Sequence, residues 1–231
     1  MPRLPGLSRR KEPAQPRPTR DYGANWVPRD ETEAMDQILN NPNPEEFEAA
    51  GRRDAEERIG PLLEPTDTVL DLGCGIGRVT RYVAPMCREI WAVDASETML
   101  GYARERLASL PNVRFALSEG LRFAEVPTAT VDVAYSLLTL QHVEREHAFR
   151  LLRELHRVLR PGGSAFLTFP NLLSEQYLDA FLYYVEVDEV GNPARARFYT
   201  PEEVGRLLPA AGFEVRRLVA ENEIFATCEA A

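Results

Sequence analysis

Short apolar runs alternate with segments of helical periodicity along the middle of the chain. We expect strands where an apolar run is short and bounded by turn residues, at 68–72, 89–94, 112–117, 131–138 and 164–169. Most of the stretches between them have the spacing of helices, at 78–86, 96–110 and 144–160. Strands that alternate with helices favour right-handed crossovers. The pattern therefore predicts an α/β fold with a Rossmann-like, doubly wound and mostly parallel sheet that has helices on both faces.

Further elements flank this core. Two helices are predicted before it, at 30–40 and 44–64. Pro161-Gly162-Gly163 is expected to stop the helix that precedes the last core strand. The regular pattern weakens over 170–200. A helix then follows Thr200, its expected N-cap, and ends at Gly212, and two closing strands are expected as an antiparallel pair at 213–220 and 223–230.

Composition narrows the class of protein. Of the 231 residues, 44% are hydrophobic and 27% are charged, which is ordinary for a soluble globular protein. No apolar run approaches the roughly 18 residues that span a bilayer. The three cysteines are scattered, which argues against a disulfide framework and favours a reducing, cytoplasmic setting.

Charge is distributed unevenly between the N-terminus and the rest of the chain. Residues 1–20 carry six basic side chains and one acidic one, a net +5, so the remainder carries −14 of the total of −9. Residues 1–21 are therefore expected to form a disordered, Pro-rich basic arm. An acidic body is a poor partner for nucleic acid, and no nucleic-acid or membrane partner is predicted.

The stretch TVLDLGCGIGRVT (68–80) raises the question of a ligand. Ligands of open α/β sheets bind at the carboxyl ends of the strands, and the glycines after the first strand let the backbone approach one closely. A dinucleotide fingerprint needs a glycine where Arg78 stands, and Asp71 would repel a pyrophosphate. Asp71 suits a cation instead, while Asp94, at the end of the second strand, suits a ribose diol. A ribose joined to an amino-acid zwitterion, without phosphate, describes S-adenosylmethionine.

At this point the chain resembles the class I S-adenosylmethionine-dependent methyltransferases. The matching stretches occur in the family's order over about residues 68–219: VLDLGCGIGR, AVDASETML, NVRFALSEG, VDVAYSLLTLQHV, ELHRVLRPGG and FYTPEEVGRLLPAAGFEV. The resemblance implies a seven-stranded sheet with one antiparallel strand at the C-terminal end. It also implies S-adenosylmethionine as cofactor and S-adenosylhomocysteine as product. The domain then divides into a helical lid (22–66), a cofactor-binding core (67–169), a substrate-lid segment (170–200) and a closing helix with strands (201–231).

The resemblance also implies the residues that bind the cofactor. By it, Asp71 meets the amino end, Gly73, Cys74 and Gly75 wrap the methionine part, and Asp94 holds the ribose. The adenine is expected between Ala95 and Met99, with Glu119 and Gly120 beside it, and the backbone of Ser136 and Leu137 near the sulfonium. Two of these residues have another interpretation, since Asp94 also suits a helix cap and Met99 suits plain core.

The candidate catalytic residue is His142, which follows the fourth strand. An imidazole with an ordinary pKa of ~6.5 suits a general base near neutral pH, but a histidine here also suits a role in ordering the loop. Methyl transfer rests mainly on proximity and orientation, and it needs a base only where the acceptor loses a proton. No cluster of residues at ligand spacing indicates a metal site.

The acceptor is expected to be a small molecule, with oxygen, nitrogen and carbon all open as the accepting atom. Aromatic residues gather in 170–200, where a flat or apolar acceptor would fit, although such rings also suit the packing of a sheet edge. Three other classes of function stay open: a non-catalytic domain that binds the cofactor, a nicotinamide-dinucleotide oxidoreductase and an aminopropyl transferase. The sequence does not predict the oligomeric state.

Overall fold

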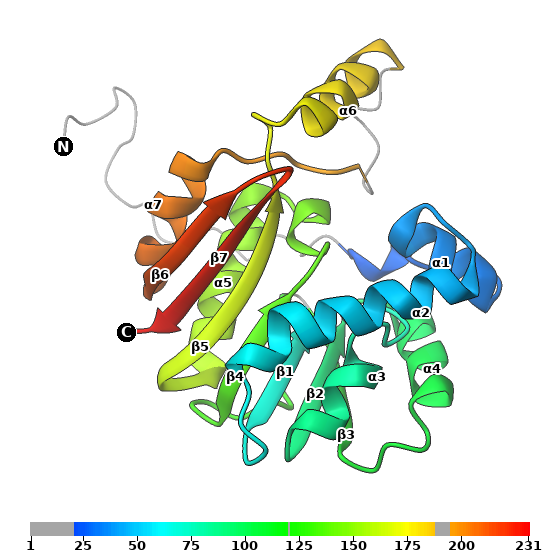
Figure 1. Ribbon diagram of the computed structural model, residues 1–231, viewed down its shortest axis with the longest axis vertical. Coiled ribbons are helices and arrows are strands. Elements are labelled where there is room, and N and C mark those ends of the chain that lie inside the picture. Colours follow the sequence, from blue (N-terminus) through cyan, green and yellow to red (C-terminus); the bar gives the residue numbers. More distant parts are fainter. Residues whose placement is uncertain (1–20, 120, 188–194) are drawn as a thin grey trace, which may run out of the picture.

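A single seven-stranded sheet runs through the protein (Figure 1). The computed structural model describes residues 21–119, 121–187 and 195–231. The strand order is β3-β2-β1-β4-β5-β7-β6. The strands are β1 (Thr68–Leu72), β2 (Glu89–Asp94), β3 (Val113–Leu117), β4 (Val131–Ser136), β5 (Leu159–Pro170), β6 (Phe213–Ala220) and β7 (Glu223–Ala230). Only β7 runs antiparallel to its neighbours, β5 and β6, so the predicted doubly wound sheet with one reversed strand is confirmed.

Helices cover both faces of this sheet (Figure 1). They are α1 (Glu31–Leu39), α2 (Pro44–Arg53), α3 (Thr80–Val83), α4 (Glu97–Arg106), α5 (Arg145–Val158), α6 (Glu175–Glu186) and α7 (Pro201–Ala211). Short turns of other helix types adjoin them, at η1 (Gly23–Asn25), η2 (Asp54–Ile59), η3 (Gly60–Leu62), η4 (Ala84–Met86) and η5 (Leu140–His142).

The two faces of the sheet have separate hydrophobic cores. Alternate residues of β1 point to opposite faces, as in any strand. Leu70 and Leu72 pack with α5 and α7, whereas Val69 packs with η2, α3 and α4. Asp71 has the same parity as Val69, so its side chain lies on the α3 face. This places a carboxylate at the carboxyl end of β1 beside the start of α3.

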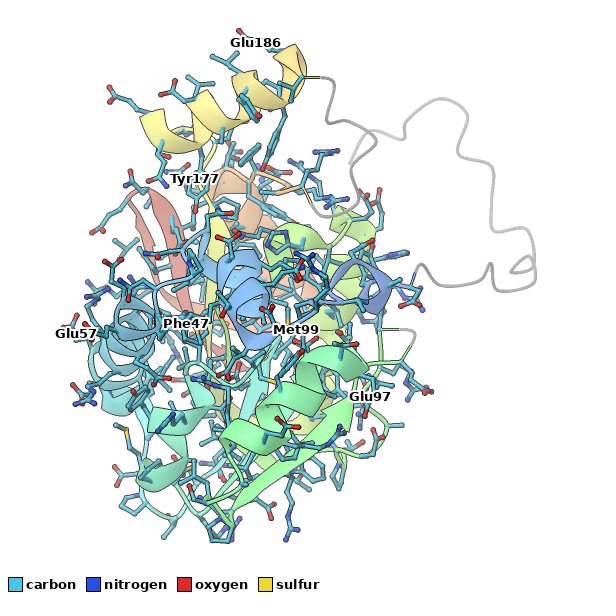
Figure 2. The ribbon with its side chains drawn as sticks, turned by 90° about the vertical axis from the view of Figure 1, so that its right-hand side faces the viewer. Phe47, Glu57, Glu97, Met99, Tyr177 and Glu186 are labelled. Carbon is cyan, nitrogen blue, oxygen red and sulfur yellow. The ribbon has the colours of Figure 1, made fainter. Side chains whose placement is uncertain are left out.

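The N-terminal helices pack over the glycine loop and α4 through a third, smaller core. Its members are Ala34, Met35, Phe47, Ile76 and Met99. Figure 2 shows Phe47 and Met99 in the interior, between these helices and α4. The helix predicted over 44–64 begins at Pro44 and continues through the π-helical turn η2 and the 3-10 turn η3. This packing brings the chain that precedes α1 against the carboxyl end of the sheet.

The last core strand begins earlier than its apolar run predicts. The preceding helix ends at Val158, and Pro161-Gly162-Gly163 already belongs to β5. A side chain at Gly163 would come within 3.0 Å of the Asp132 carbonyl, so the glycine lets β5 approach β4 where their register shifts. The Pro-Gly-Gly triplet thus forms an irregularity inside the sheet.

Helix α6 was not predicted at all. It projects from the body beyond β5, with Tyr177 directed toward the body and Glu186 at its far end (Figures 1 and 2). None of its residues is buried. Ser174 caps its N-terminus by accepting from the Tyr177 amide. Its polar residues Glu175, Gln176, Asp179 and Glu186 lie on one side, so the helix has an apolar stripe, and much of that stripe is exposed.

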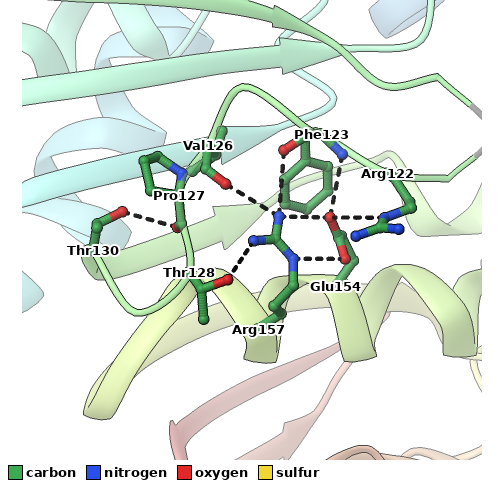
Figure 3. A network of polar contacts seen from close by, with 8 residues as sticks. All are labelled: Arg122, Phe123, Val126, Pro127, Thr128, Thr130, Glu154 and Arg157. Carbon is green, nitrogen blue, oxygen red and sulfur yellow. Dashed lines mark hydrogen bonds and ion pairs between the residues drawn. The ribbon is translucent and has the colours of Figure 1, made fainter.

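A polar network anchors the connection between β3 and β4 to α5 (Figure 3). The guanidinium of Arg157 donates to Glu154 Oε1 at 2.7 Å, to the Val126 carbonyl at 3.1 Å and to Thr128 Oγ1 at 2.9 Å. Glu154 is buried and also accepts from the Phe123 amide. A charged pair that meets several backbone groups fixes a loop more firmly than a lone surface pair does. The connection carries Glu119 and Leu121 toward the carboxyl end of the sheet.

Three further expectations concern the C-terminal elements, the N-terminal arm and a membrane-spanning helix. The closing helix and hairpin are confirmed, with Thr200 and Glu203 forming a capping box at α7 and Gly212 in the left-handed conformation after it. The basic arm lies outside the described residues but for Asp21. Within the described part of the chain, no helix combines the length and the hydrophobicity that crossing a membrane requires.

Candidate active site

One cavity of about 580 Å³ opens at the carboxyl ends of β1, β2 and β4. Its volume lies in the range that holds cofactors and small ligands. Most of the predicted site residues line it, namely Asp71, Gly73, Cys74, Gly75, Asp94, Ala95, Met99, Glu119, Leu137 and His142. Ser136 is not among the lining residues and donates its hydroxyl to the Leu72 carbonyl at 3.0 Å. Gly120 lies outside the described residues. The fold thus brings predicted site residues between positions 71 and 142 together around one cavity.

The backbone of the glycine loop is held by the strand beside it. The amides of Gly73 and Cys74 both donate to the Val93 carbonyl, at 2.7 and 3.0 Å. The amide of Gly75 donates to Asp94 Oδ2 at 2.9 Å. A phosphate-binding loop keeps such N–H groups free for its ligand, whereas here all three are engaged by the protein. These three amides are therefore not available to a pyrophosphate, while the glycines still allow a ligand to approach the backbone closely.

Close packing explains why glycine stands at the start of this loop. Gly73 has a φ of +81°, and a Cβ there would lie 2.0 Å from Thr139 Oγ1. Thr139 follows β4, and its hydroxyl lies 3.4 Å from the Gly73 carbonyl. The loops after β1 and β4 therefore touch at Gly73, and a side chain at this position would push them apart.

Asp71 is a buried carboxylate in a network of hydroxyl groups. Its Oδ2 accepts from Thr80 Oγ1 at 2.6 Å and from Tyr135 Oη at 2.9 Å. Burial raises the pKa of Asp71 to about 6, although both hydroxyl donors and the guanidinium of Arg78 lower it. At neutral pH the side chain is mostly ionised and lies at the wall of the cavity. It offers a negative charge to a cationic ligand group.

Asp94 joins the loop to the next helix. Its Oδ1 accepts from the Ser96 amide at 2.8 Å, and its Oδ2 accepts from Gly75. Burial raises the pKa of Asp94, while the amide donors lower it. The alternative role as helix cap falls to Ser96, whose Oγ accepts from the Met99 amide at the start of α4. A carboxylate has about four lone-pair sites, so Asp94 retains acceptors for ligand hydroxyls.

Met99 satisfies both interpretations of its side chain. It is 1% exposed and packs in the small core with Ile76 and Phe47, yet it also lines the cavity. Ala95, Leu117 and Leu121 give the same side of the cavity an apolar surface. This side can receive a flat, apolar ring.

The segment Tyr22–Trp26, which precedes α1, forms part of the cavity wall. Tyr22 Oη lies 2.7 Å from His147 Nδ1 and accepts from the Glu144 amide at 3.2 Å. A Cβ at Gly23 would lie 2.1 Å from the Ala95 carbonyl, so the segment rests directly on the loop after β2. Trp26 meets the ring of His142 edge to face, with centroids 4.8 Å apart. This arrangement supports the predicted lid function of the segment, which stays a prediction.

His142 ends the short turn η5 and lines the cavity. Its Nε2 lies 3.0 Å from Nε2 of Gln141, and its carbonyl accepts from the guanidinium of Arg197 at 3.2 Å. Arg197 also donates its backbone amide to the Gln141 carbonyl at 2.7 Å. The turn that carries His142 is thus fixed from outside the cavity, and the ring reaches the cavity. Because an amide nitrogen only donates, His142 Nε2 accepts in the contact with Gln141, which agrees with a role in ordering the loop, while the role as a base stays a prediction.

The aromatic residues of 170–200 lie elsewhere. Tyr177, Phe181 and Tyr184 of α6 pack around Phe198, with ring centroids 5.8–6.2 Å apart. No described residue of this segment lines the cavity. The part of the cavity nearest His142 is formed instead by Trp26, Leu138 and Val143, together with Thr139. The acceptor role of 170–200 stays a prediction.

Several lining residues were not identified from the sequence. Thr139, Leu138, Ile38 and Ser96 belong to loops or helices that meet only in the folded chain. Arg78, considered only as the residue that breaks a dinucleotide motif, is a buried cation at the wall that pairs with Asp54 at 2.7 Å. No group of three or more potential ligand residues is placed to hold a metal ion among the residues that the structure describes.

Comparison with known proteins gives one consistent family. A family model described as "Methyltransferase domain" matches residues 69–163. The chain is 30% identical over 156 residues to a ubiquinone biosynthesis O-methyltransferase of Pseudomonas paraeruginosa, with 66% of each chain covered. It is 36% identical over 168 residues to a malonyl-[acyl-carrier protein] O-methyltransferase of Pectobacterium atrosepticum, with 66% of this chain and 64% of that one covered. The matches thus span slightly less than two thirds of these relatives' lengths.

Solved structures share the fold. A structure of a SAM-dependent methyltransferase from Aquifex aeolicus superposes with a TM-score of 0.59 at 23% identity, covering 82% of this chain and 99% of that one. At this identity the likeness concerns the arrangement of the elements alone.

Proposed function

Because the chain belongs to the class I S-adenosylmethionine-dependent methyltransferases, we propose that it transfers a methyl group from S-adenosylmethionine to an oxygen atom of a small-molecule acceptor. The observation that carries the proposal is that Asp71 and Asp94 line the same cavity. The loop between them has its first three amides hydrogen-bonded to the protein. S-adenosylmethionine is the family's cofactor. The acceptor and the accepting atom are inferences from the site and from the names of the relatives.

The residues of the cavity fit this cofactor. The ionised Asp71 matches the ammonium of the methionine part, and the spare acceptors of Asp94 match the hydroxyls of a ribose. Ala95 and Met99 give an apolar surface for the adenine. The amides of Gly73, Cys74 and Gly75 are engaged by the protein and the carboxylate of Asp71 would repel a pyrophosphate, so a nicotinamide dinucleotide fits poorly.

When bound, the cofactor supplies a methyl group activated by its sulfonium. The chain's own residues supply position and exclusion of water, effects that can account for roughly 7–11 kcal/mol of a barrier. The segment Tyr22–Trp26 covers the cavity, and Leu137, Leu138 and Val143 make its wall apolar near His142. The imidazole of His142 then takes the proton that an acceptor hydroxyl loses as it attacks.

The acceptor is inferred to be small and largely apolar around the hydroxyl group. The relatives named above are O-methyltransferases, which favours oxygen over nitrogen and carbon. Among the residues that the structure describes, the wall near His142 consists mainly of apolar side chains and has no row of cations for a polyanion. From the sequence we retain the proposal of a cytoplasmic protein without a nucleic-acid or membrane partner.

The test is a methyl-transfer assay with radiolabelled S-adenosylmethionine. The purified chain is incubated with a panel of phenols, catechols and carboxylic acids, and label is measured in the extracted products. We expect transfer to at least one hydroxylated or carboxylated acceptor by the wild type and a large loss in Asp94→Ala. Transfer to amines alone would overturn the assignment of oxygen, and absence of transfer to the whole panel would count against the small-molecule acceptor.

A further inference from the structure

Only one of the two oxygens of the Asp71 carboxylate accepts hydrogen bonds from the described residues. Both hydroxyl donors, Thr80 from the start of α3 and Tyr135 from β4, approach the same oxygen, Oδ2, at 2.6 and 2.9 Å. Within the part of the chain that the structure describes, no hydrogen bond reaches Oδ1. Asp71 nevertheless lines the cavity. The two oxygens therefore differ in role, because one is held by the protein and the other remains for a ligand.

Both donors are themselves fixed. Thr80 and Tyr135 are fully buried, and neither has room to turn to water. Burial and the charge of Asp71 raise the pKa of the Tyr135 phenol, so it stays protonated and remains a donor. Two short bonds from rigid positions fix the plane of the carboxylate, and hydrogen bonds to a charged acceptor are roughly twice as strong as neutral ones.

We propose that Tyr135 and Thr80 are positioning residues for the ammonium group of the ligand, which they serve by holding Oδ2 of Asp71 and directing Oδ1 to the cavity. The inference rests on the proposed function, since it takes the ligand to be S-adenosylmethionine or its product. The pair makes the cavity select ligands with a positively charged amino group over neutral analogues. It does so without contacting the ligand.

Among the described residues, few other charged groups lie around Asp71. Arg78 precedes α3 and favours the ionised form of Asp71, but its guanidinium is already paired with Asp54. Asp94, at the end of β2, opposes ionisation by its like charge. Cys74 lies in the same loop, and burial raises the pKa of its thiol, so it is neutral. The hydroxyl pair is thus the closest support for a charge that burial disfavours.

A pH dependence follows from this arrangement. The pKa of Asp71 is about 6 in the ligand-free protein, above the ordinary 3.8, because burial outweighs the two hydrogen bonds. The ligand's ammonium binds the ionised form, so affinity falls as the pH drops through about 6. Removing a hydroxyl donor raises the pKa of Asp71 further, which moves this fall in affinity to higher pH.

The experiment is a calorimetric titration with S-adenosylhomocysteine between pH 5 and 8, on the wild type and on Tyr135→Phe. We expect the acid limb of the affinity profile of the variant to lie about half a unit or more higher than that of the wild type. Thr80→Val should move it in the same direction, and Thr80→Ser, which keeps the hydroxyl, should restore the wild-type profile. The ligand-free proteins give a second readout, because the carboxyl ¹³C shift of Asp71 should titrate at the same displaced pH.

Two controls separate positioning from general damage. Tyr199→Phe removes another buried phenol, one whose hydroxyl has no hydrogen-bond partner among the described residues, so the profile should not move. The ligand 5′-methylthioadenosine lacks the amino acid part. Its affinity should be the same for the wild type and Tyr135→Phe across this pH range.

The outcomes are distinguishable. A displaced profile for S-adenosylhomocysteine, with none for 5′-methylthioadenosine, supports the inference. An affinity profile for S-adenosylhomocysteine that is unchanged in Tyr135→Phe, or a loss of affinity that is equally large for 5′-methylthioadenosine, overturns it while the proposed function stands. If the wild type binds S-adenosylhomocysteine at no pH, the inference and the proposed function fall together.

Discussion

The amide of Gly75 donates to the carboxylate of Asp94 at 2.9 Å, so the last residue of β2 holds the loop that follows β1. The contact joins the two strand ends that the cavity uses most. It also means that Asp94 shapes the loop as well as facing the ligand.

Asp94→Ala should therefore weaken the binding of S-adenosylhomocysteine in two ways, by removing ribose contacts and by freeing the amide of Gly75. We expect an affinity loss on the order of 10-fold to 100-fold, the usual worth of one or two hydrogen bonds to a charged group. Calorimetry measures it. The matched control is Asp132→Ala, since Asp132 accepts the Thr68 amide at 2.8 Å between the same kinds of strands but at the amino end of the sheet. Equal losses in both variants would remove Asp94 from the site.

Gly73→Ala should lower the free energy of unfolding by more than its conformation alone explains. An alanine with positive φ costs about 1–2 kcal/mol, and the added Cβ would also meet Thr139 at 2.0 Å. Gly162 is a suitable control, because its φ of +74° is similar and no atom lies within 4 Å of the added Cβ. Urea unfolding should show Gly73→Ala as the less stable variant by at least about 1 kcal/mol. Similar stabilities would show that the loops after β1 and β4 do not press on each other.

His142→Ala should reduce kcat by about 100-fold or more if the imidazole takes the acceptor's proton. Cofactor affinity should change little, since none of the predicted cofactor contacts involves the His142 ring. The comparison is His156→Ala, whose ring packs on Phe213, away from the cavity lining. Full activity in His142→Ala would rule out the imidazole as the base, whereas loss of folding would favour the role in ordering the loop.

Tyr22→Phe should loosen the N-terminal segment that covers the cavity. The phenol links this segment to His147 and to the Glu144 amide, and its loss costs about 1 kcal/mol. We expect the KM for the cofactor to rise roughly fivefold with a smaller change in kcat. Tyr183→Phe, on an exposed ring of α6, should leave both constants unchanged. An unaltered KM in Tyr22→Phe would argue that the segment does not act as a lid.

The parts of the structure that were predictable from the sequence are those set by local pattern. β1, β2, β6 and β7 have the predicted bounds because their apolar runs and the turn residues around them coincide. Asp71 and Asp94 were identified because each follows from the position of a strand end. The match of six ordered motifs to a family then supplied the number of strands and the reversed strand at the C-terminal end, whereas the strand order came only from the structure.

The parts that were missed depend on contacts between distant residues. The hydrogen bond from Tyr135 to Asp71 joins positions 64 residues apart, and nothing at position 135 marks the tyrosine as more than strand core. Thr139 becomes part of the site only because Gly73 lets the two loops touch. Helix α6 was missed because the pattern over 170–200 as a whole is irregular, although the apolar residues within the helix keep a helical spacing.

The most direct test of the central claim is a calorimetric titration of the full chain with S-adenosylhomocysteine at pH 7.5, with NAD as the comparison ligand. The geometry of Asp71, Asp94 and the engaged loop amides predicts micromolar binding of the first at a stoichiometry of about one, and no binding of the second. A folded protein that does not bind S-adenosylhomocysteine, or that binds NAD with similar affinity, would contradict the assignment of this cavity as a site for S-adenosylmethionine.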